Sequence, residues 1–392
     1  MPLPRDALMA FKSDTVRGTP GFFRVAQHQN GAWSLLTPDG QPWFARAVNS
    51  VQPAVDSPHD PVARLRAWGF NVLGPGSSAD LILDGLVFIR TVDFASCGNT
   101  IRAEGIRLPD VFDSTWPAKA GTRAADVCAS AADQSDLLGW LSDDDLIWGA
   151  VTLEDRPSLL QVCLSLEPGF AAYHAAWEFV LARHSGQLSG VAKAWDIPLE
   201  NKEVIRECTR SDAAIMSGGY RADNQTWIDE VARRYFATTS AAIRAYDQNH
   251  LLFGIRDAAG YRRQSGSRAS LAQGVEPAVD IAWVHPNVLD ANTAGPVFVG
   301  EFNWTRQLPA TPARSRGVTA VERMLRDGRQ RLRALSRHPA VVGYAWDFWG
   351  DAPGDLPPFG RGLVHLNDAE AREHTELVTY LNREISRLQR DH

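Results

Sequence analysis

Eight short apolar segments recur along this chain of 392 residues, and segments with a helical pattern of apolar residues separate them. The apolar segments lie at residues 47–51, 71–74, 87–94, 137–142, 250–256, 279–285, 296–302 and 340–349. Strands that are apolar along their whole length are buried on both faces, as in a parallel sheet covered by helices. Eight such strands within about 300 residues favour a closed barrel over an open doubly wound sheet. The sequence therefore predicts an α/β fold, a (β/α)8 TIM barrel.

The helical patterns between these segments lie at residues 60–70, 158–184, 225–246, 317–336 and 375–390. Before the first strand, the turn signals Asn30-Gly31 and Pro38-Asp39-Gly40 separate short stretches of strand pattern, which predicts a β-hairpin. No Pro- or Ser-rich linker divides the remainder. We therefore expect residues 1–44 to form an N-terminal segment and hairpin packed on the barrel, and residues 45–392 to form the barrel with its C-terminal helix.

Composition excludes several classes of function. The net charge is −6, and the basic residues, mostly arginines, are interleaved with acids, so no basic stripe for nucleic acid is present. The four lysines, Lys12, Lys119, Lys193 and Lys202, lie outside the predicted strands, which argues against a Schiff-base barrel enzyme. The first strand lacks a paired histidine motif and no C-x-x-C pair occurs, so we expect no metal and no other cofactor. The oligomeric state stays open.

The start of the chain has no basic region followed by an apolar run of signal-peptide length, and no stretch of about 18 apolar residues occurs. We expect a protein that does not interact with a membrane. The sequence as given predicts a cytoplasmic location, and removal of a leader would indicate a secreted or periplasmic one instead.

Carboxylates at the ends of two predicted strands are the main candidates for catalysis, because the carboxyl ends of barrel strands face the active site. Glu301 ends one apolar run, and its alternative role is a structural bond to the backbone or to Arg256. Asp143, Asp144 and Asp145 end another, and their mutual repulsion favours a retained proton, which a general acid needs. A solvated turn is the alternative for these aspartates. Two carboxylates about 5–5.5 Å apart are the minimum for a retaining glycosidase.

Further polar and aromatic residues at or near the strand ends are predicted to line the substrate pocket: Asn49, Arg256, His285, Trp346, Asp347, Trp140, Asn303 and Trp304. A Trp side chain can stack on the apolar face of a sugar ring. Packing within the barrel is the alternative for Trp346, and a structural role is the alternative for His285.

Seven segments, taken in order, resemble glycoside hydrolase family 50, the β-agarase family of clan A, from about residue 31 to the C-terminus. The stretch NGAWSLLTPDGQPWFARAVNSV is similar to the hairpin and first strand of that family, and LRAWGFNVLG is similar to its L-x-x-W-G-F-N-T-L-G. LGWLSDDDLIWG resembles I-G-Y-F-V-D-N-E-L-x-W-G, and PVFVGEFNW resembles P-I-I-I-G-E-F-H-F. The remaining similar segments are AYDQNHLLFGIR, HPAVVGYAW and FGRGLVHLNDAEAREHTELV.

The resemblance implies a retaining glycoside hydrolase with Glu301 as the nucleophile and Asp145 as the acid/base, since Leu146 and Trp148 fix the alignment. Asp144 is the second choice for the acid/base. The family has Asn-Glu where this chain has Asp144-Asp145, and the shorter Asp places its carboxyl about 1.5 Å further from the glycosidic oxygen. The expected activity is double displacement on a β-linked oligo- or polysaccharide, galactoside- or agarose-like or related. The alternative is a catalytically impaired barrel that binds carbohydrate without hydrolysis.

Overall fold

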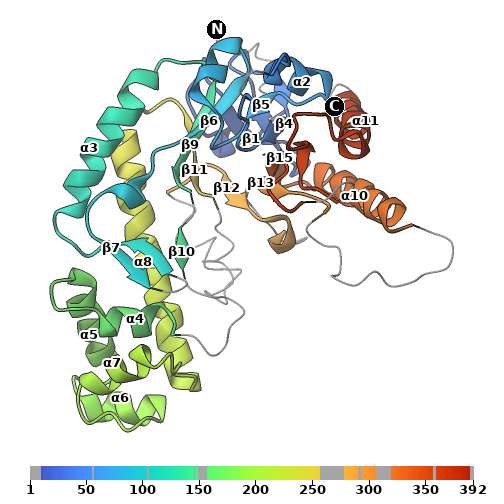
Figure 1. Cartoon of the computed structure of the whole chain (residues 1–392). Coiled ribbons are helices and arrows are strands. Elements are labelled where there is room, and N and C mark those ends of the chain that lie inside the picture. Colours follow the sequence, from blue (N-terminus) through green and yellow to red (C-terminus); the bar gives the residue numbers. More distant parts are fainter. Residues whose placement is uncertain are drawn as a thin grey trace.

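The computed structural model describes residues 10–54, 57–103, 106–144, 146–148, 157–256, 278–289, 293, 295–305, 319–355 and 359–388. Its centre is a parallel sheet of eight strands (Figure 1). The strands are β4 (Ala45–Val48), β5 (Val72–Leu73), β6 (Val87–Thr91), β9 (Leu137–Asp143), β11 (Leu251–Ile255), β12 (Ala282–Val284), β13 (Val297–Phe302) and β14 (Val341–Trp346). The order β11-β9-β6-β5-β4-β14-β13-β12 follows the chain round a barrel. The two outer strands of this order meet where the Ile281 N–H donates to the Leu252 carbonyl at 3.1 Å. The predicted (β/α)8 barrel is confirmed, and each of the eight apolar segments contributes a strand.

Large aromatic side chains fill the barrel interior beside small residues. Trp283 stacks on Phe298 with ring centroids 4.7 Å apart, and Phe253 meets the edge of Trp283 at 6.1 Å. Gly300 makes room for this cluster, because a Cβ atom there would lie 1.7 Å from Nε1 of Trp283. A glycine is therefore required directly before Glu301.

The N-terminal part of the chain covers the amino end of the barrel. It forms an antiparallel sheet of β1 (Arg24–Gln27), β2 (Trp33–Leu36) and β3 (Pro42–Trp43), so the predicted hairpin is present with a third short strand. Val25 and Leu35 are fully buried in the same apolar cluster as the barrel residue Phe298. The Trp33 N–H donates to the carbonyl of Pro339, which precedes β14. The exact division at residue 44 stays a prediction.

Helices cover the outside of the barrel. Those at predicted positions include α2 (Pro61–Ala67), α10 (Ala320–Ser336) and α11 (Arg372–Leu388), whereas α3 (Trp116–Cys128) lies in a segment for which no helix is predicted. The side chain of Asp60 caps α2, and Thr319 and Glu322 form a capping box at the start of α10. Within the described part of the chain, no helix is both long enough and apolar enough to cross a membrane.

A helical lobe stands between β9 and its barrel helix, which the sequence analysis does not predict as a separate unit. The lobe contains α4 (Leu159–Ser165), α5 (Ala171–Arg183), α6 (Leu188–Trp195) and α7 (Glu203–Arg210). The helix α8 (Gly218–Arg244) then runs for 27 residues, about 40 Å, from the lobe to the barrel (Figure 1). Because the insertion follows the carboxyl end of β9, the lobe stands on the side of the barrel where active sites lie.

A small antiparallel sheet adjoins the lobe. It consists of β7 (Thr100–Ala103), β8 (Ile106–Pro109) and β10 (Ile147–Trp148), in the order β10-β8-β7. Asp110, directly after β8, accepts a hydrogen bond at 3.0 Å from the N–H of Ala172 in α5. This bond joins the lobe to the connection that follows β6.

Candidate active site

One arginine and three carboxylates meet at the carboxyl ends of four barrel strands. Arg256 follows β11, and its Nη1 lies 2.8 Å from Oδ2 of Asp144. Its Nε lies 3.7 Å from Oε1 of Glu301, and its Nη2 lies 3.9 Å from Oδ1 of Asp347. The structure thus brings together four residues that the sequence analysis places in the pocket. The ion pair with Arg256, the structural alternative for Glu301, is present in the same arrangement.

Arg256 has a strongly acidic surrounding. Its side chain is only 12% exposed, and burial alone would lower the pKa of the guanidinium. The charges of Asp144, Glu301 and Asp347 outweigh burial and raise that pKa above its ordinary value. The arginine therefore remains a permanent cation, and the short contact with Asp144 is a charge-assisted hydrogen bond that favours the ionised carboxylate.

Asn49, at the end of β4, fixes the backbone next to Glu301. The side chain of Asn49 is fully buried, and its Nδ2 donates to the carbonyl of Gly300 at 2.8 Å. Its own N–H donates to the carbonyl of Trp346 at 2.9 Å, so Asn49 joins the ends of β4, β13 and β14. In this arrangement Asn49 holds the strand that carries Glu301, and its predicted contact with substrate stays a prediction.

A buried network supports the end of β9. The hydroxyl of Tyr235, in α8, donates to Oδ2 of Asp143, and the N–H of Ala95 donates to Oδ1 at 2.7 Å. Burial raises the pKa of the Asp143 carboxyl to about 7, against the hydrogen bonds from Tyr235 and Ala95, which lower it. Tyr235 cannot be found from the sequence, because one tyrosine within a helical pattern gives no signal of its partner in a distant strand.

The three tryptophans predicted to contact sugar are all buried, with at most 3% of each residue exposed. Nε1 of Trp140 donates to Asp247 at 2.6 Å, and the structure does not bring this residue to the Arg256 cluster. Nε1 of Trp346 donates to the Arg361 carbonyl at 3.1 Å, and Nε1 of Trp304 donates to His374 at 3.0 Å. The surroundings of Trp346 agree with the alternative that it packs within the barrel, and its contact with sugar stays a prediction.

Asn303, like Trp346, bonds to other parts of the protein. Its Nδ2 donates to the same Arg361 carbonyl at 2.9 Å, and its Oδ1 accepts from the Thr305 N–H at 2.6 Å. His285, after β12, is half-buried, and its Nδ1 accepts from the Asn287 N–H at 3.2 Å. Sugar contacts by these two side chains stay predictions.

Asp145, the predicted acid/base, lies outside the described residues. Its neighbours on both sides are described: Asp144 contacts Arg256, and Leu146 is buried. Trp148 is fully buried in β10, which pairs with β8. Among the described residues, no group of three or more His, Cys, Asp or Glu side chains is placed to hold a metal ion.

A groove of about 720 Å³ lies elsewhere on the molecule, beside α11 and the end of α2. Trp68, Glu376, Tyr380 and Arg383 are among its lining residues. None of the carboxylates around Arg256 lines it, so the groove is separate from the strand-end cluster.

No family model matches the chain. Beta-agarase A of Vibrio sp. (strain JT0107) is 24% identical to it over 212 residues, which cover 50% of this chain and 21% of that protein. The structure of an agarase superimposes with a TM-score of 0.69 at 15% identity, over 97% of this chain and 67% of the agarase chain. BpGH50 superimposes with a TM-score of 0.65 at 17% identity, over 98% of this chain and 86% of its own.

The chain has the fold of these proteins. The resemblance to glycoside hydrolase family 50 that the sequence motifs predict is confirmed. The matched region spans 21% of the length of the Vibrio relative.

Proposed function

We propose that the chain is a retaining glycoside hydrolase that cleaves a β-linked oligo- or polysaccharide by double displacement. The observation that supports this most strongly is the convergence of Glu301 and the acidic end of β9 on Arg256. The cluster stands at the carboxyl end of the barrel, where barrel enzymes place their catalytic residues. Retaining glycosidases need two carboxylates about 5–5.5 Å apart, on either side of the glycosidic bond.

In the first step, Glu301 attacks the anomeric carbon while an acid protonates the departing glycosidic oxygen. The bond to the leaving sugar breaks, and a glycosyl ester of Glu301 forms. In the second step, the same acid, now a base, takes a proton from water, and the water oxygen replaces Glu301 at the anomeric carbon. Glu301 returns as a carboxylate and the acid recovers its proton, so the cycle balances.

Asp145 is the better candidate for the acid/base, although Asp144 precedes it directly. A general acid must hold a proton before the reaction, and the 2.8 Å contact with Arg256 favours the ionised form of Asp144. Asp144 therefore acts as the partner that orients Arg256, and the exchange of protons falls to Asp145.

The proposed substrate class is an agarose-like chain, which the names of the similar agarases suggest, or a related β-galactoside. Arg256 offers hydrogen-bond donors to sugar hydroxyls beside Glu301, and Asp347 offers acceptors. Two departures from the family motifs, Asp144-Asp145 in place of Asn-Glu and Asn303 in place of His, favour an oligosaccharide related to agarose over agarose itself.

The ion pair between Asp144 and Arg256 also supports a second candidate function, carbohydrate binding without hydrolysis. It favours the ionised form of Asp144, so only Asp145 is left as a proton donor. In this alternative, the shorter Asp145 fails to reach the glycosidic oxygen. A displacement of about 1 Å at a reacting group costs on the order of a hundredfold in rate.

A substrate screen with the wild type and with Glu301→Gln tests the proposal. The panel contains aryl β-galactosides, β-glucosides, β-mannosides and agaro-oligosaccharides, and NMR identifies the anomer released first. We expect cleavage with retention, and a loss on the order of 10³-fold or more in Glu301→Gln. Glu384→Gln is the matched control and should keep full activity, because it changes a carboxylate of α11 that pairs with Arg333 of α10.

Each result of the screen separates the candidates. Unchanged turnover in Glu301→Gln, or release of the inverted anomer, overturns the assignment of Glu301 as nucleophile. Sugar binding by the wild type with no cleavage anywhere in the panel favours the second candidate.

A further inference from the structure

We propose that Tyr235, a residue of the inserted helix α8, is a positioning residue for the acidic strand end that carries Asp144 and Asp145. The inference rests on the proposed function, because it gives that strand end the acid/base role. It adds a residue outside the strand ends and joins the helical lobe to the site.

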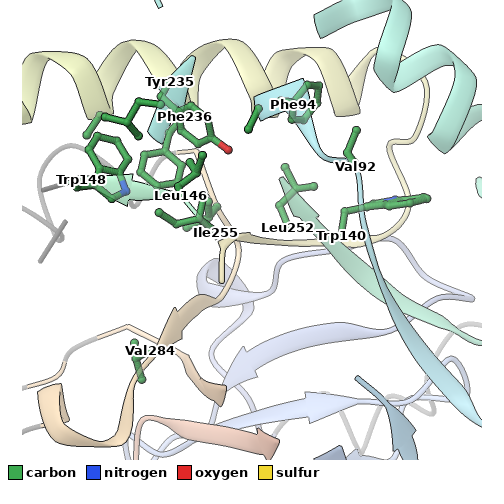
Figure 2. Packing of buried hydrophobic residues seen from close by; sticks show 14 of the residues in the cluster. Val92, Phe94, Trp140, Leu146, Trp148, Tyr235, Phe236, Leu252, Ile255 and Val284 are labelled. Atoms are coloured by element: carbon green, nitrogen blue, oxygen red, sulfur yellow. The ribbon is translucent and has the colours of Figure 1, made fainter. Parts of the chain in front are cut away.

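Tyr235 is fully buried where α8 passes over the ends of β9 and β11 (Figure 2). Its ring stacks on Trp116 with centroids 6.0 Å apart and meets Trp148 edge-on at 6.2 Å. Aromatic contacts on both sides restrict the ring, so the hydroxyl has a fixed direction. That hydroxyl donates to Oδ2 of Asp143, with Oγ of Ser142 2.9 Å away as a second acceptor.

Hydrogen bonds from three directions meet at the end of β9. The N–H of Ala95, after β6, donates to Asp143, and the hydroxyl of Ser142 donates to the Gly254 carbonyl of β11 at 2.8 Å. Tyr235 supplies the third direction, from the helix layer. The strand end therefore has fixed neighbours on each side and in the layer above.

This fixed strand end determines where the site residues stand. The carbonyl of Asp143 accepts the backbone N–H of Arg256 at 2.9 Å, and Asp144 follows directly in the chain. The side chains of Arg256 and Asp144 then meet at 2.8 Å. Releasing Asp143 from Tyr235 would remove one of the bonds that fix the backbone next to Asp144 and, through the Asp143 carbonyl, next to Arg256.

Burial of a carboxylate costs desolvation free energy, which indicates that Asp143 has a role beyond packing. Asp143 is fully buried, and desolvation raises the pKa of its carboxyl to about 7. The charged groups that act on it besides its partners are Asp93, which raises that pKa, and Arg107, which lowers it. An apolar pair in place of Asp143 and Tyr235 would avoid the desolvation cost but would remove the directional bonds that Tyr235 and Ala95 make to Asp143.

The test compares Tyr235→Phe with Tyr220→Phe. Tyr220 lies on the same helix, is equally buried, and its hydroxyl bonds to Ser158 and to the Gln161 N–H inside the lobe. We expect Tyr235→Phe to lower kcat by about 10- to 100-fold, with KM changed less than about twofold, because the acid/base is displaced and binding is retained. Tyr220→Phe should lower the unfolding temperature similarly while leaving kcat within about twofold of the wild type.

A crystal structure of Tyr235→Phe gives a readout that needs no activity. We expect the contact between Asp144 and Arg256 to lengthen in this variant and to remain in Tyr220→Phe. An unchanged contact overturns the positioning role, whatever the kinetics show. An inactive wild type counts against the proposed function alone, since the displacement of Asp144 still decides the role of Tyr235.

If Tyr235→Phe does not fold, Asp143→Ala carries the same test from the other partner, because it removes the acceptor of the Tyr235 hydroxyl. Loss of kcat in Asp143→Ala together with a displaced Asp144 supports the pair as a unit. Where both single variants fold, the double variant should be no worse than Asp143→Ala alone, because that change already removes the bond to Tyr235. Fully additive losses of kcat contradict the proposal.

Discussion

The ends of β9 and β13 carry the two proposed catalytic groups, but the protein holds them in different ways. The end of β13 is fixed within the barrel, since Trp283 fills the space beside Gly300 and Asn49 bonds to the Gly300 carbonyl. The end of β9 also bonds to β11, and in addition it is fixed by groups from outside the sheet, namely Tyr235 of α8 and the N–H of Ala95.

This comparison separates what the barrel supplies from what the insertion supplies. The contacts named for Gly300 come from barrel strands or their ends, so the barrel holds the backbone that carries Glu301. The acidic side depends on α8, whose first half belongs to the helical lobe. We therefore expect changes in the lobe to affect the acid/base before they affect Glu301.

Single substitutions of the two aspartates after β9 should have the largest effect, because they test which of them is the acid/base. We expect Asp145→Asn to lower kcat by about 10² to 10⁴, because it removes the proposed proton donor. Asp144→Asn, the matched control, should cost less, because an amide oxygen still accepts a hydrogen bond from Arg256. The measurement is kcat on an aryl glycoside and on one with a poorer leaving group, which depends more on the acid. A larger loss in Asp144→Asn would move the acid/base role to Asp144.

Filling the space beside Glu301 tests the β13 side. In Gly300→Ala, the new Cβ would lie 1.7 Å from Nε1 of Trp283. We expect the free energy of unfolding to fall by about 2 kcal/mol or more, since the barrel interior has no room for the methyl group. Gly169→Ala is the control, because a Cβ there meets no atom within 4 Å. Urea unfolding measures both, and equal stability of the two variants would contradict the packing argument.

The pH dependence of stability tests the β9 side. The pKa of Asp143 is raised to about 7 in the folded state from an ordinary value of 3.8, so its favourable contribution is present below pH 4 and is lost as the pH rises to 7. Asp143→Asn has no such loss, and we expect its stability relative to the wild type to improve between pH 4.5 and about pH 8.

Asp113→Asn provides the control for this titration. Hydrogen bonds from Thr115 lower the pKa of Asp113 below 3.8, so its contribution changes only at lower pH and stays flat from about pH 5 upward. Urea unfolding at several pH values measures both variants. A pH-independent difference between Asp143→Asn and the wild type would show that Asp143 ionises normally in the fold.

The barrel and part of the site could be predicted from the sequence for one reason. A strand buried on both faces leaves a continuous apolar run, and a carboxylate at its end, such as Glu301, stands out against that run. The same logic finds Asp144, Arg256 and Asp347, which the structure brings together.

The remaining features leave no such local signal. The helical lobe has the same periodicity as a barrel helix, so the pattern at residues 158–184 does not reveal an insertion. Tyr235 and Asp143 are 92 residues apart, and only the path of α8 brings them together. The tryptophans were expected at the sugar because of their position near strand ends, yet Trp140 is fully buried beside Asp247. Side-chain direction at the end of a strand depends on neighbouring elements that one segment does not encode.

Covalent trapping tests the central claim most directly. A 2-fluoro glycoside with a good leaving group reacts with the nucleophile of a retaining glycosidase and leaves a stable ester, which peptide mass spectrometry locates. We predict one label, on the peptide that contains Glu301, and none in Glu301→Gln. A label on another residue, or turnover of ordinary substrates with no label formed, would contradict the proposal that Glu301 is the nucleophile of this barrel.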